Sequence, residues 1–411
     1  MRFFAILVKN GVKMEQLIEK FRRKLLFTDT RFVRSIIHKI NWNSRLIGIK
    51  GARGVGKSTL LLQYIKLNLM DDINSVLYVS LDNLWFIKNS LTDLVDNFAK
   101  NGGKFLFLDE VHKYKDWSVE IKNIYDDYPE IKIVFTGSSL LEILNARADL
   151  SRRAITYIMQ GLSFREYFEL SENIKFDIFS LEDLLAGHFE ISNIINEKIK
   201  PIKHFKNYLK FGYYPYFVQG EELYHQRLEE VINFIIEIEL PQLQNININY
   251  INKIKQLLMI ISESVPFIPN ISKISQKISV NRETLLNYIY YLNEANILFS
   301  AFYDNKGISL LQKPDKIFLE NTNQIYALMA DLSNPGSIRE TFFANQIKYY
   351  HKINISKVTD FIVDNKYSFE IGGKQKNNKQ LQGLKDSFIA ADDIEFGFGN
   401  KIPLWLFGFL Y

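Results

Sequence analysis

A phosphate-binding pattern lies near the start of the chain. Residues 51–58 read Gly-Ala-Arg-Gly-Val-Gly-Lys-Ser and fit GxxxxGK[ST], the Walker A motif. Its glycines let successive backbone N–H groups turn toward phosphate oxygens, and the helix that follows adds its N-terminal dipole. We expect Lys57 to reach the β- and γ-phosphates of ATP and Ser58 to ligate Mg²⁺. The expected ATP-binding residues are Gly51, Ala52, Arg53, Gly54, Val55, Gly56, Lys57, Ser58 and Thr59.

Two acids follow the apolar segment Lys104–Leu108 in the manner of a Walker B motif. Asp109 is the expected second Mg²⁺ ligand, and Glu110 the base that polarises the attacking water. An acid pair after an apolar strand is a weak signal alone. Here a further apolar segment, Ser75–Leu81, separates it from the phosphate-binding loop, which is typical of P-loop ATPases that hydrolyse with a glutamate.

Two more residues are candidates for catalysis. Ser138 follows the next apolar segment, where a hydroxyl can touch the γ-phosphate or the water; the alternative is a helix N-cap in this segment. Arg153 precedes the last expected strand and would act as an arginine finger on a neighbouring subunit's nucleotide. A solvated surface arginine is the alternative there.

The elements that must position these residues alternate between strand and helix. Helical patterns at 58–70 and 116–128 lie between short apolar segments. This alternation predicts an α/β fold with a parallel sheet covered on both faces. The expected strands are Leu46–Lys50, Ser75–Leu81, Lys104–Leu108, Ile131–Thr136 and Ala154–Gln160.

Composition narrows the class of protein. The chain has 411 residues, 47% of them apolar and 24% charged, which is the balance of a folded protein of two to four domains. Cysteine is absent, which excludes disulfides and thiolate sites. No apolar run approaches the roughly 18–20 residues that span a bilayer, so we expect a cytoplasmic protein without membrane contact.

Four segments, in chain order, carry a family resemblance: GARGVGKST, FLDEVHKY, FTGSSLLE and SRR…GLSFREY. They resemble prokaryotic AAA-superfamily P-loop ATPases with a C-terminal domain of unknown function related to PD-(D/E)XK nucleases. The resemblance covers about Met14–Tyr411. It implies an oligomer-capable ATPase with a helical lid around FGYYP, a winged helix and a nuclease-like tail, and it supports Arg153. The expected domains are an N-terminal helical segment at 1–45, a P-loop core at 46–165, a lid at 166–249, a winged helix at 250–325 and the tail at 326–411.

Charge does not decide whether the chain binds DNA. The helix–turn–helix pattern of Ile271–Lys277 and Asn281–Glu294, with a wing at Ile297–Leu319, would read a major groove. Residues 251–320, however, hold eight Lys or Arg and six Asp or Glu, and the net charge of the whole chain is +5. A protein-packing module on the same fold is the alternative. A denser basic run, which includes Arg34, lies at 20–39, and we expect it to be a solvated face.

The tail contains the residue types of a metal-dependent nuclease in altered spacing. Glu340, Asp360, Glu370 and Lys374 are the candidates. Glu370 and Lys374 would lie about 13 Å apart along an extended strand, unless Gly372-Gly373 forms a bulge. We therefore expect a folded domain without nuclease activity, and we expect its last ten residues to form a buried strand.

The sequence thus predicts a Mg²⁺-dependent ATPase that acts as a DNA-associated, nucleotide-driven switch or motor. One alternative is a signalling or assembly ATPase whose C-terminal modules bind protein. Another is an ATP-gated nuclease. The expected partners are ATP, DNA and further copies of the chain.

Overall fold

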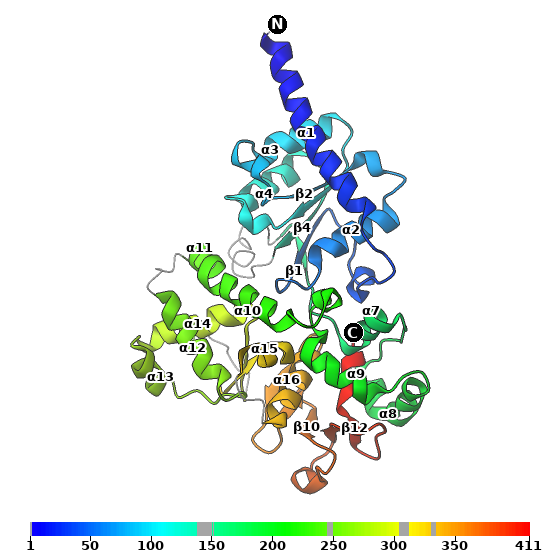
Figure 1. The fold of residues 1–411 in the computed structure, drawn as a ribbon, viewed down its shortest axis with the longest axis vertical. Helices are drawn as coiled ribbons and strands as arrows, with labels where there is room; N and C mark the ends of the chain where they lie inside the picture. The colour runs from blue at the N-terminus through cyan, green and yellow to red at the C-terminus, as the bar shows by residue number, and fades with distance from the viewer. Residues whose placement is uncertain (1, 138–149, 151, 245–249, 304–311, 330–333) are drawn as a thin grey trace. The chain divides into compact units, whose positions relative to one another are not determined.

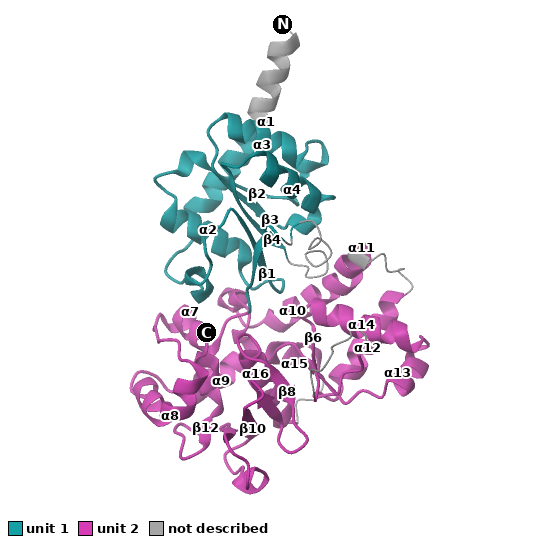
Figure 2. Ribbon diagram, turned by 180° about the vertical axis from the view of Figure 1, so that it is seen from behind, with its two compact units in different colours: residues 1–160 teal, residues 161–411 magenta. Residues whose placement is uncertain are grey.

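The computed structural model of the chain describes residues 2–137, 150, 152–244, 250–303, 312–329 and 334–411, with side chains except at 2–13, 243 and 244. The described chain divides into two compact units, Met1–Gln160 and Gly161–Tyr411 (Figures 1 and 2). The finer division into five domains stays a prediction.

The first unit is built on a five-stranded parallel sheet in the order β2-β3-β4-β1-β5. The strands are β1 (Leu46–Lys50), β2 (Val76–Ser80), β3 (Phe105–Asp109), β4 (Lys132–Gly137) and β5 (Ile155–Ile158). The predicted α/β class and all five predicted strands are confirmed. β4 lies between β1 and β3, so the phosphate-binding loop and the two acids follow strands that flank a common neighbour.

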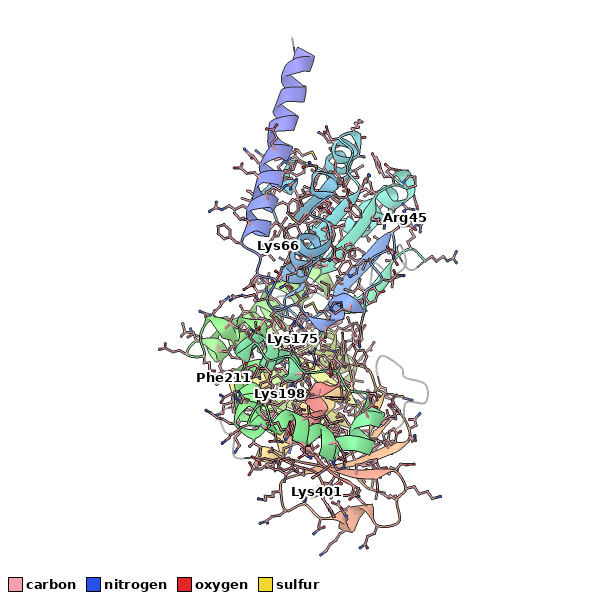
Figure 3. The ribbon with its side chains drawn as sticks, turned by 90° about the vertical axis from the view of Figure 1, so that its right-hand side faces the viewer. Arg45, Lys66, Lys175, Lys198, Phe211 and Lys401 are labelled. Atoms are coloured by element: carbon pink, nitrogen blue, oxygen red, sulfur yellow. The ribbon has the colours of Figure 1, made fainter. Side chains whose placement is uncertain are left out.

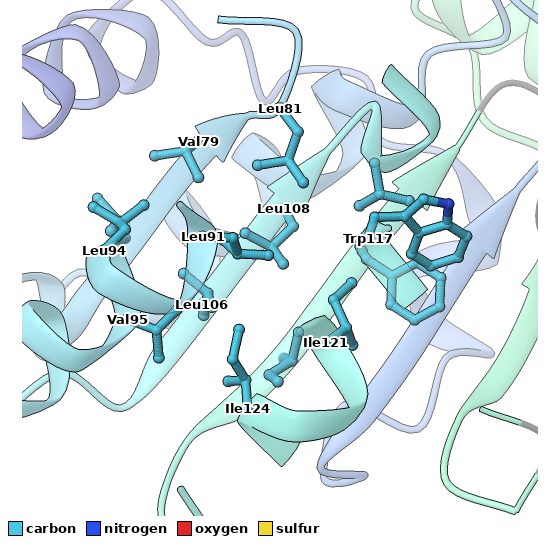
Figure 4. Packing of buried hydrophobic residues seen from close by; sticks show 14 of the residues in the cluster. Val79, Leu81, Leu91, Leu94, Val95, Leu106, Leu108, Trp117, Ile121 and Ile124 are labelled. Atoms are coloured by element: carbon cyan, nitrogen blue, oxygen red, sulfur yellow. The ribbon is translucent and has the colours of Figure 1, made fainter. Parts of the chain in front are cut away.

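Alternating side chains of these strands divide the unit into two apolar layers. Val79 and Leu81 from the β2 segment and Leu106 and Leu108 of β3 point to one face (Figure 4). Helices α3 (Leu91–Lys100) and α4 (Trp117–Asp127) cover that face. The intervening residues Tyr78 and Phe107 point to the other face and contact rings of α1 and α2.

Two helices supply the opposite layer. They are α1 (Arg2–Leu26) and α2 (Lys57–Asn68). Phe21 of α1 contacts Tyr78 at 6.2 Å between ring centroids, and Tyr64 of α2 contacts Phe107 at the same separation. Because Asp109 follows Phe107 by two residues, its side chain also points to this face, where the phosphate-binding loop leads into α2.

The second unit begins with helices. They are α7 (Phe164–Glu172), α8 (Leu181–Asn196), α9 (Pro201–Asn207), α10 (Tyr224–Phe234), α11 (Leu240–Gln244), α12 (Ile251–Ser262), α13 (Ile271–Ile278) and α14 (Arg282–Glu294). The predicted break at Phe211–Phe217 is present, as a π-helical turn to Gly212 and a 3₁₀ turn from Pro215. An antiparallel pair, β6 (Leu298–Ala301) and β7 (Lys316–Leu319), follows α14. These are the elements predicted for a winged helix, and that assignment stays a prediction.

The C-terminal part pairs two helices with a mixed sheet. Helices α15 (Thr322–Leu328) and α16 (Pro335–Ile347) precede strands β8 (Ile353–Ile355), β9 (Phe361–Val363), β10 (Tyr367–Gly372), β11 (Ser387–Ala391) and β12 (Lys401–Pro403). Their order is β12-β11-β10-β9-β8, with β10, β11 and β12 mutually parallel. The predicted terminal strand was wrong beyond Pro403, because Leu404–Phe409 forms a buried 3₁₀ helix. Every residue of Leu404–Phe409 is buried, so the segment lacks the apolar and polar alternation of a half-buried strand. A fully apolar run of this length does not distinguish a buried strand from a buried helix.

Candidate functional site

The segment between β1 and α2 has the backbone of a phosphate-binding loop. Gly54 and Gly56 have positive φ angles of 86° and 100°, which glycine adopts without steric penalty. The Lys57 side chain is buried, and its Nζ donates to the carbonyl oxygens of Gly51 at 2.9 Å and Ala52 at 2.8 Å. The ammonium group therefore lies within the curve of the loop, at the N-terminus of α2.

Gly51 is required for a different reason. A Cβ atom on this residue would lie 2.1 Å from the carbonyl oxygen of Met159, just after β5. Any other residue would force the loop away from the segment that follows the edge strand. The first glycine of the motif thus allows close packing, whereas Gly54 and Gly56 allow the turn.

Asp109 is buried, with 3% of its surface exposed. Two hydroxyl groups orient its carboxylate. Tyr78 of β2 donates to Oδ2 at 2.7 Å, and Thr136 of β4 donates to Oδ1. The Thr136 oxygen also accepts the backbone N–H of Glu110 at 3.2 Å. The register explains the arrangement, since Leu108 pairs with Phe135 and Asp109 therefore lies beside Thr136. One side chain of the central strand thus contacts both acidic residues.

Tyr78 also connects Asp109 to the phosphate-binding loop. Burial raises the pKa of its phenol well above the usual range, and the nearby Asp109 carboxylate adds to the shift, while a hydrogen bond with Ser58 acts in the opposite direction. The phenol is therefore neutral at every physiological pH. It contacts both residues that the sequence nominates as Mg²⁺ ligands.

Glu110 differs from Asp109 in its surroundings. Its backbone is left-handed, with φ of 53°, at the residue that directly follows the end of β3. Its side chain is 23% exposed, and Oε2 lies 3.4 Å from Nε2 of the buried His112. A carboxylate that is partly open to water and contacted by a ring nitrogen has the setting of a general base.

The other two catalytic candidates have different outcomes. Ser138 lies outside the described residues. Arg153 forms a two-fold ion pair within its own unit, from Nε to Asp126 Oδ1 and from Nη2 to Asp126 Oδ2, each at 3.0 Å. A guanidinium in trans would have to exchange this partner for a phosphate.

The acids predicted in the tail lie near one another in the second unit. Burial raises the pKa of Glu340 to about 7, Lys316 opposes the shift, and the charges of Asp360 and Glu370 add to it. Asp360 Oδ2 accepts the backbone N–H of Ile371 at 2.7 Å.

The lysine beside this acid cluster comes from an unexpected position. Lys376 places its Nζ 2.5 Å from Glu370 Oε1, whereas Lys374 offers its backbone carbonyl to Lys401. A turn in which Lys376 N–H donates to Gly373 O reverses the chain after β10. The two glycines thus lead out of the strand, and the reversal brings the later lysine back to the glutamate.

Sequence reasoning missed Thr136 and Tyr78. Thr136 stands two residues before the chosen Ser138, and it ends an apolar run directly beside the acid strand. A polar residue at that position is a usable signal once the strand order is known. Tyr78 gave no such signal, because a tyrosine in an apolar strand reads as core.

The described residues suit ATP with Mg²⁺. No group of three or more His, Asp or Glu side chains arranged for a metal occurs in the part of the chain that the structure describes. Mg²⁺ is commonly held by one or two protein oxygens together with phosphates and water, for which Ser58 and Asp109 suffice. The positive-φ glycines and Lys57 suit the phosphates.

Two parts of the chain are similar to known protein families. Residues 43–168 match the family described as AAA domain, and residues 202–329 match a domain of unknown function. The uncharacterized protein MJ1637 of Methanocaldococcus jannaschii is 27% identical over 295 residues, which cover 67% of this chain. The alignment spans only 61% of that relative's length.

Similarity to solved structures is distant. AMPPCP-bound DnaA from Aquifex aeolicus matches with a TM-score of 0.29 and 14% identity over 63% of this chain and 85% of its own. PCH-2 of C. elegans matches at 0.25 and 16% over 70% and 67%. The S. cerevisiae Hsp104–ADP complex matches at 0.27 and 14% over 68% and 41%. Scores of this size carry no conclusion about function.

No described helix combines the length and the apolar character that crossing a membrane requires.

Proposed function

We propose that the chain binds ATP with Mg²⁺ and hydrolyses it at the carboxyl ends of β1, β3 and β4. The observation that carries this proposal is the position of β4, which pairs with both β1 and β3. The phosphate-binding loop and the acid pair therefore lie near each other, at the carboxyl ends of the parallel strands. Ligands of open parallel sheets bind at these ends. The match of residues 43–168 to the AAA domain family supports the same reading.

Each residue has a defined task in this proposal. The loop amides and Lys57 bind the phosphates, and Ser58 and Asp109 hold Mg²⁺, which supplies positive charge against the phosphate oxygens. Glu110 accepts a proton from the attacking water. Thr136 and Tyr78 keep the Asp109 carboxylate in place without neutralising it, because a hydroxyl donates a hydrogen bond and carries no charge.

Paired substitutions test the site. Lys57→Ala should weaken ATP binding severely, since the phosphates lose the ammonium group that lies within the loop. Glu110→Gln should bind ATP normally and reduce turnover by roughly a hundredfold or more, because the metal ligands remain and the base is lost. The matched controls are Lys104→Ala and Glu130→Gln, both exposed in the same unit. Parental turnover in Glu110→Gln would refute the assignment of the base.

We further propose that the ATPase acts on DNA. Lys273 and Lys277 of α13 and Arg282 at the start of α14 are all exposed, on the two helices predicted to approach a groove. Duplex DNA should stimulate turnover, less so as salt rises, because phosphate contacts release counterions. Replacing the three residues with alanine should remove the stimulation and leave basal turnover unchanged. Absence of stimulation at every salt concentration would favour the alternative, an assembly ATPase whose second unit binds protein.

Arg153 defines a separate proposal, action in trans within an oligomer. Arg153→Ala should reduce turnover and spare nucleotide affinity. Mixing it with Glu110→Gln should restore part of the activity, because some interfaces then combine an intact base with an intact arginine. No recovery in confirmed oligomers would argue against a finger.

A further inference from the structure

Arg34 departs from the expectation for its basic segment. It is 5% exposed, although the run at 20–39 was expected to be a solvated face. Its Nη1 donates to the carbonyl oxygen of Val55 at 2.9 Å, and its Nη2 donates to that of Gln160 at 2.7 Å. Two separate nitrogens of one planar group are thus fixed by two separate backbone segments, which leaves the guanidinium little freedom to rotate.

The first of these carbonyls belongs to the phosphate-binding loop. A trans peptide is planar, with its C=O and N–H groups pointing in opposite directions. Arg34, by holding the Val55 oxygen, therefore directs the N–H of Gly56 away from itself. Gly56 has a φ of 100° and immediately precedes Lys57 and the first turn of α2. Its N–H is one of the loop amides that such a motif turns toward phosphate.

We propose that Arg34 is a positioning residue for nucleotide phosphates, which fixes the Val55–Gly56 peptide with its N–H toward the ligand. The inference rests on the proposed binding of ATP at this loop. A glycine peptide rotates easily, so an unrestrained loop would spend part of its time with the carbonyl oxygen facing the phosphates, which repels them. A charge-assisted hydrogen bond in a buried position opposes that rotation.

The second carbonyl anchors the arginine itself. Gln160 follows β5 and Met159, whose carbonyl oxygen is the one that excludes a side chain at position 51. Arg34 and Gly51 therefore connect the phosphate-binding loop to the same short segment. This segment is hydrogen-bonded to the end of β1, since Met159 N–H donates to Lys50 O at 2.7 Å. The arginine thus fixes the phosphate-binding loop relative to the segment that follows the edge strand β5.

The chain offers a matched control for loosening the segment that carries Arg34. Gln63 of α2 donates from Nε2 to the carbonyl oxygens of Asp29 and Phe32, both at 2.7 Å. Lys66, labelled in Figure 3, donates to the Thr28 carbonyl at 2.8 Å. Replacing Gln63 with alanine removes two hydrogen bonds from the same segment and leaves the hydrogen bond from Arg34 to Val55 in place.

The experiment compares Arg34→Ala, Arg34→Lys and Gln63→Ala in the full chain. Binding of ATP and of inorganic tripolyphosphate is measured by calorimetry, and thermal unfolding is recorded for each variant. Arg34→Ala should weaken both ligands by about the same factor, tenfold or more, because the loss lies in phosphate binding. Arg34→Lys should recover part of it, since an ammonium group can still reach the Val55 oxygen. Gln63→Ala should stay within about twofold for both ligands at a similar loss of thermal stability.

A second measurement is independent of ligand. Hydrogen exchange of peptides covering residues 51–58 should be faster in Arg34→Ala than in the parent, and unchanged in Gln63→Ala. Failure of the parent to bind either ligand would refute the proposed ATP site, while the exchange comparison would still test Arg34. Equal effects of Arg34→Ala and Gln63→Ala on affinity and exchange would overturn the proposal and leave Arg34 a structural residue. Weakening of ATP but not of tripolyphosphate would overturn it as well.

Discussion

The two acid clusters of the molecule differ in what surrounds their carboxylates. Asp109 in the first unit receives hydrogen bonds from two neutral hydroxyls, Tyr78 and Thr136. Glu340 and Glu370 in the second unit lie against the ammonium groups of Lys316 and Lys376. Hydroxyls orient a carboxylate without adding charge, whereas a lysine places a positive charge beside it that offsets the negative one. The first arrangement leaves a ligand available for a cation, and the second supplies the cation from the chain itself.

The largest expected effect concerns the charge of Glu340. Its pKa of about 7 lies above the ordinary 4.5 because of burial, so between these values the folded state binds a proton that the unfolded state has lost. Stability from this group is therefore present below about pH 4.5 and decreases as pH rises to about 7. The total loss is roughly 3 kcal/mol at most.

Glu340→Gln removes this titration. The variant should match the parent near pH 4.5 and exceed it in free energy of unfolding near pH 7.5, as measured by urea denaturation across the pH range. The matched control is Glu395→Gln, exposed in the same unit. A constant difference between Glu340→Gln and the parent at all pH values would show that Glu340 does not titrate in this window.

The second effect tests the neutral donors of the first cluster. Thr136→Val keeps the shape of the side chain but removes the hydrogen bond to Asp109 and leaves the Glu110 N–H without its acceptor. Loss of such an outer contact typically reduces metal affinity or activity by 10- to 100-fold. We expect turnover to fall within that range, and Thr136→Ser to remain near the parent. Parental kinetics in the valine variant would mean that Asp109 is oriented without Thr136.

These residues show how far the sequence predicts the molecule. The parallel sheet was predicted correctly because its strands are short apolar runs that alternate with helical patterns. The phosphate-binding motif at 51–58 follows the first of these strands, which placed the expected site at the carboxyl ends of the strands. Arg34, Tyr78 and Lys376 act through contacts with residues far along the chain or beyond a turn. From the sequence, Arg34 is equally compatible with a solvated face, Tyr78 with a core strand and Lys376 with a loop. Only the folded structure shows the contacts that these residues make.

A smaller effect is expected at Tyr78. Tyr78→Phe retains the ring that packs on Phe21 and removes the hydroxyl that donates to Asp109. Thr136 still donates to the other carboxylate oxygen, so the loss should be several-fold in turnover, with a higher Mg²⁺ requirement. A titration of Mg²⁺ at saturating ATP measures both. The matched control is Tyr64→Phe, since Tyr64 lies on the same side of the sheet. An unchanged Mg²⁺ requirement would exclude Tyr78 from the metal site.

The smallest expected effect is none at all: the second cluster should not cut DNA. Burial raises the pKa of Glu370, and the hydrogen bond from Lys376 opposes that shift. Lys376 supplies the counter-ion of Glu370 from within the chain, since its Nζ lies 2.5 Å from Oε1, and Asp360 already accepts the Ile371 N–H. A lysine that serves as the counter-ion of the glutamate is not free to act on a metal-bound water.

Purified protein with Mg²⁺ or Mn²⁺, with and without ATP, should therefore leave plasmid and single-stranded DNA intact, and Lys376→Met should behave identically. The Lys376→Met variant lacks the ammonium group that competes with a metal ion for Glu370, and it loses no residue of an active centre. If it also fails to cut DNA, the difference between this cluster and Asp109 does not depend on the lysine alone. Cleavage by the parent that disappears in Asp360→Ala and in Glu370→Ala would reverse the comparison. It would mean that a metal ion displaces the Lys376 ammonium group from Glu370. Both acid clusters would then bind a metal ion, and only the second would have to release a lysine first.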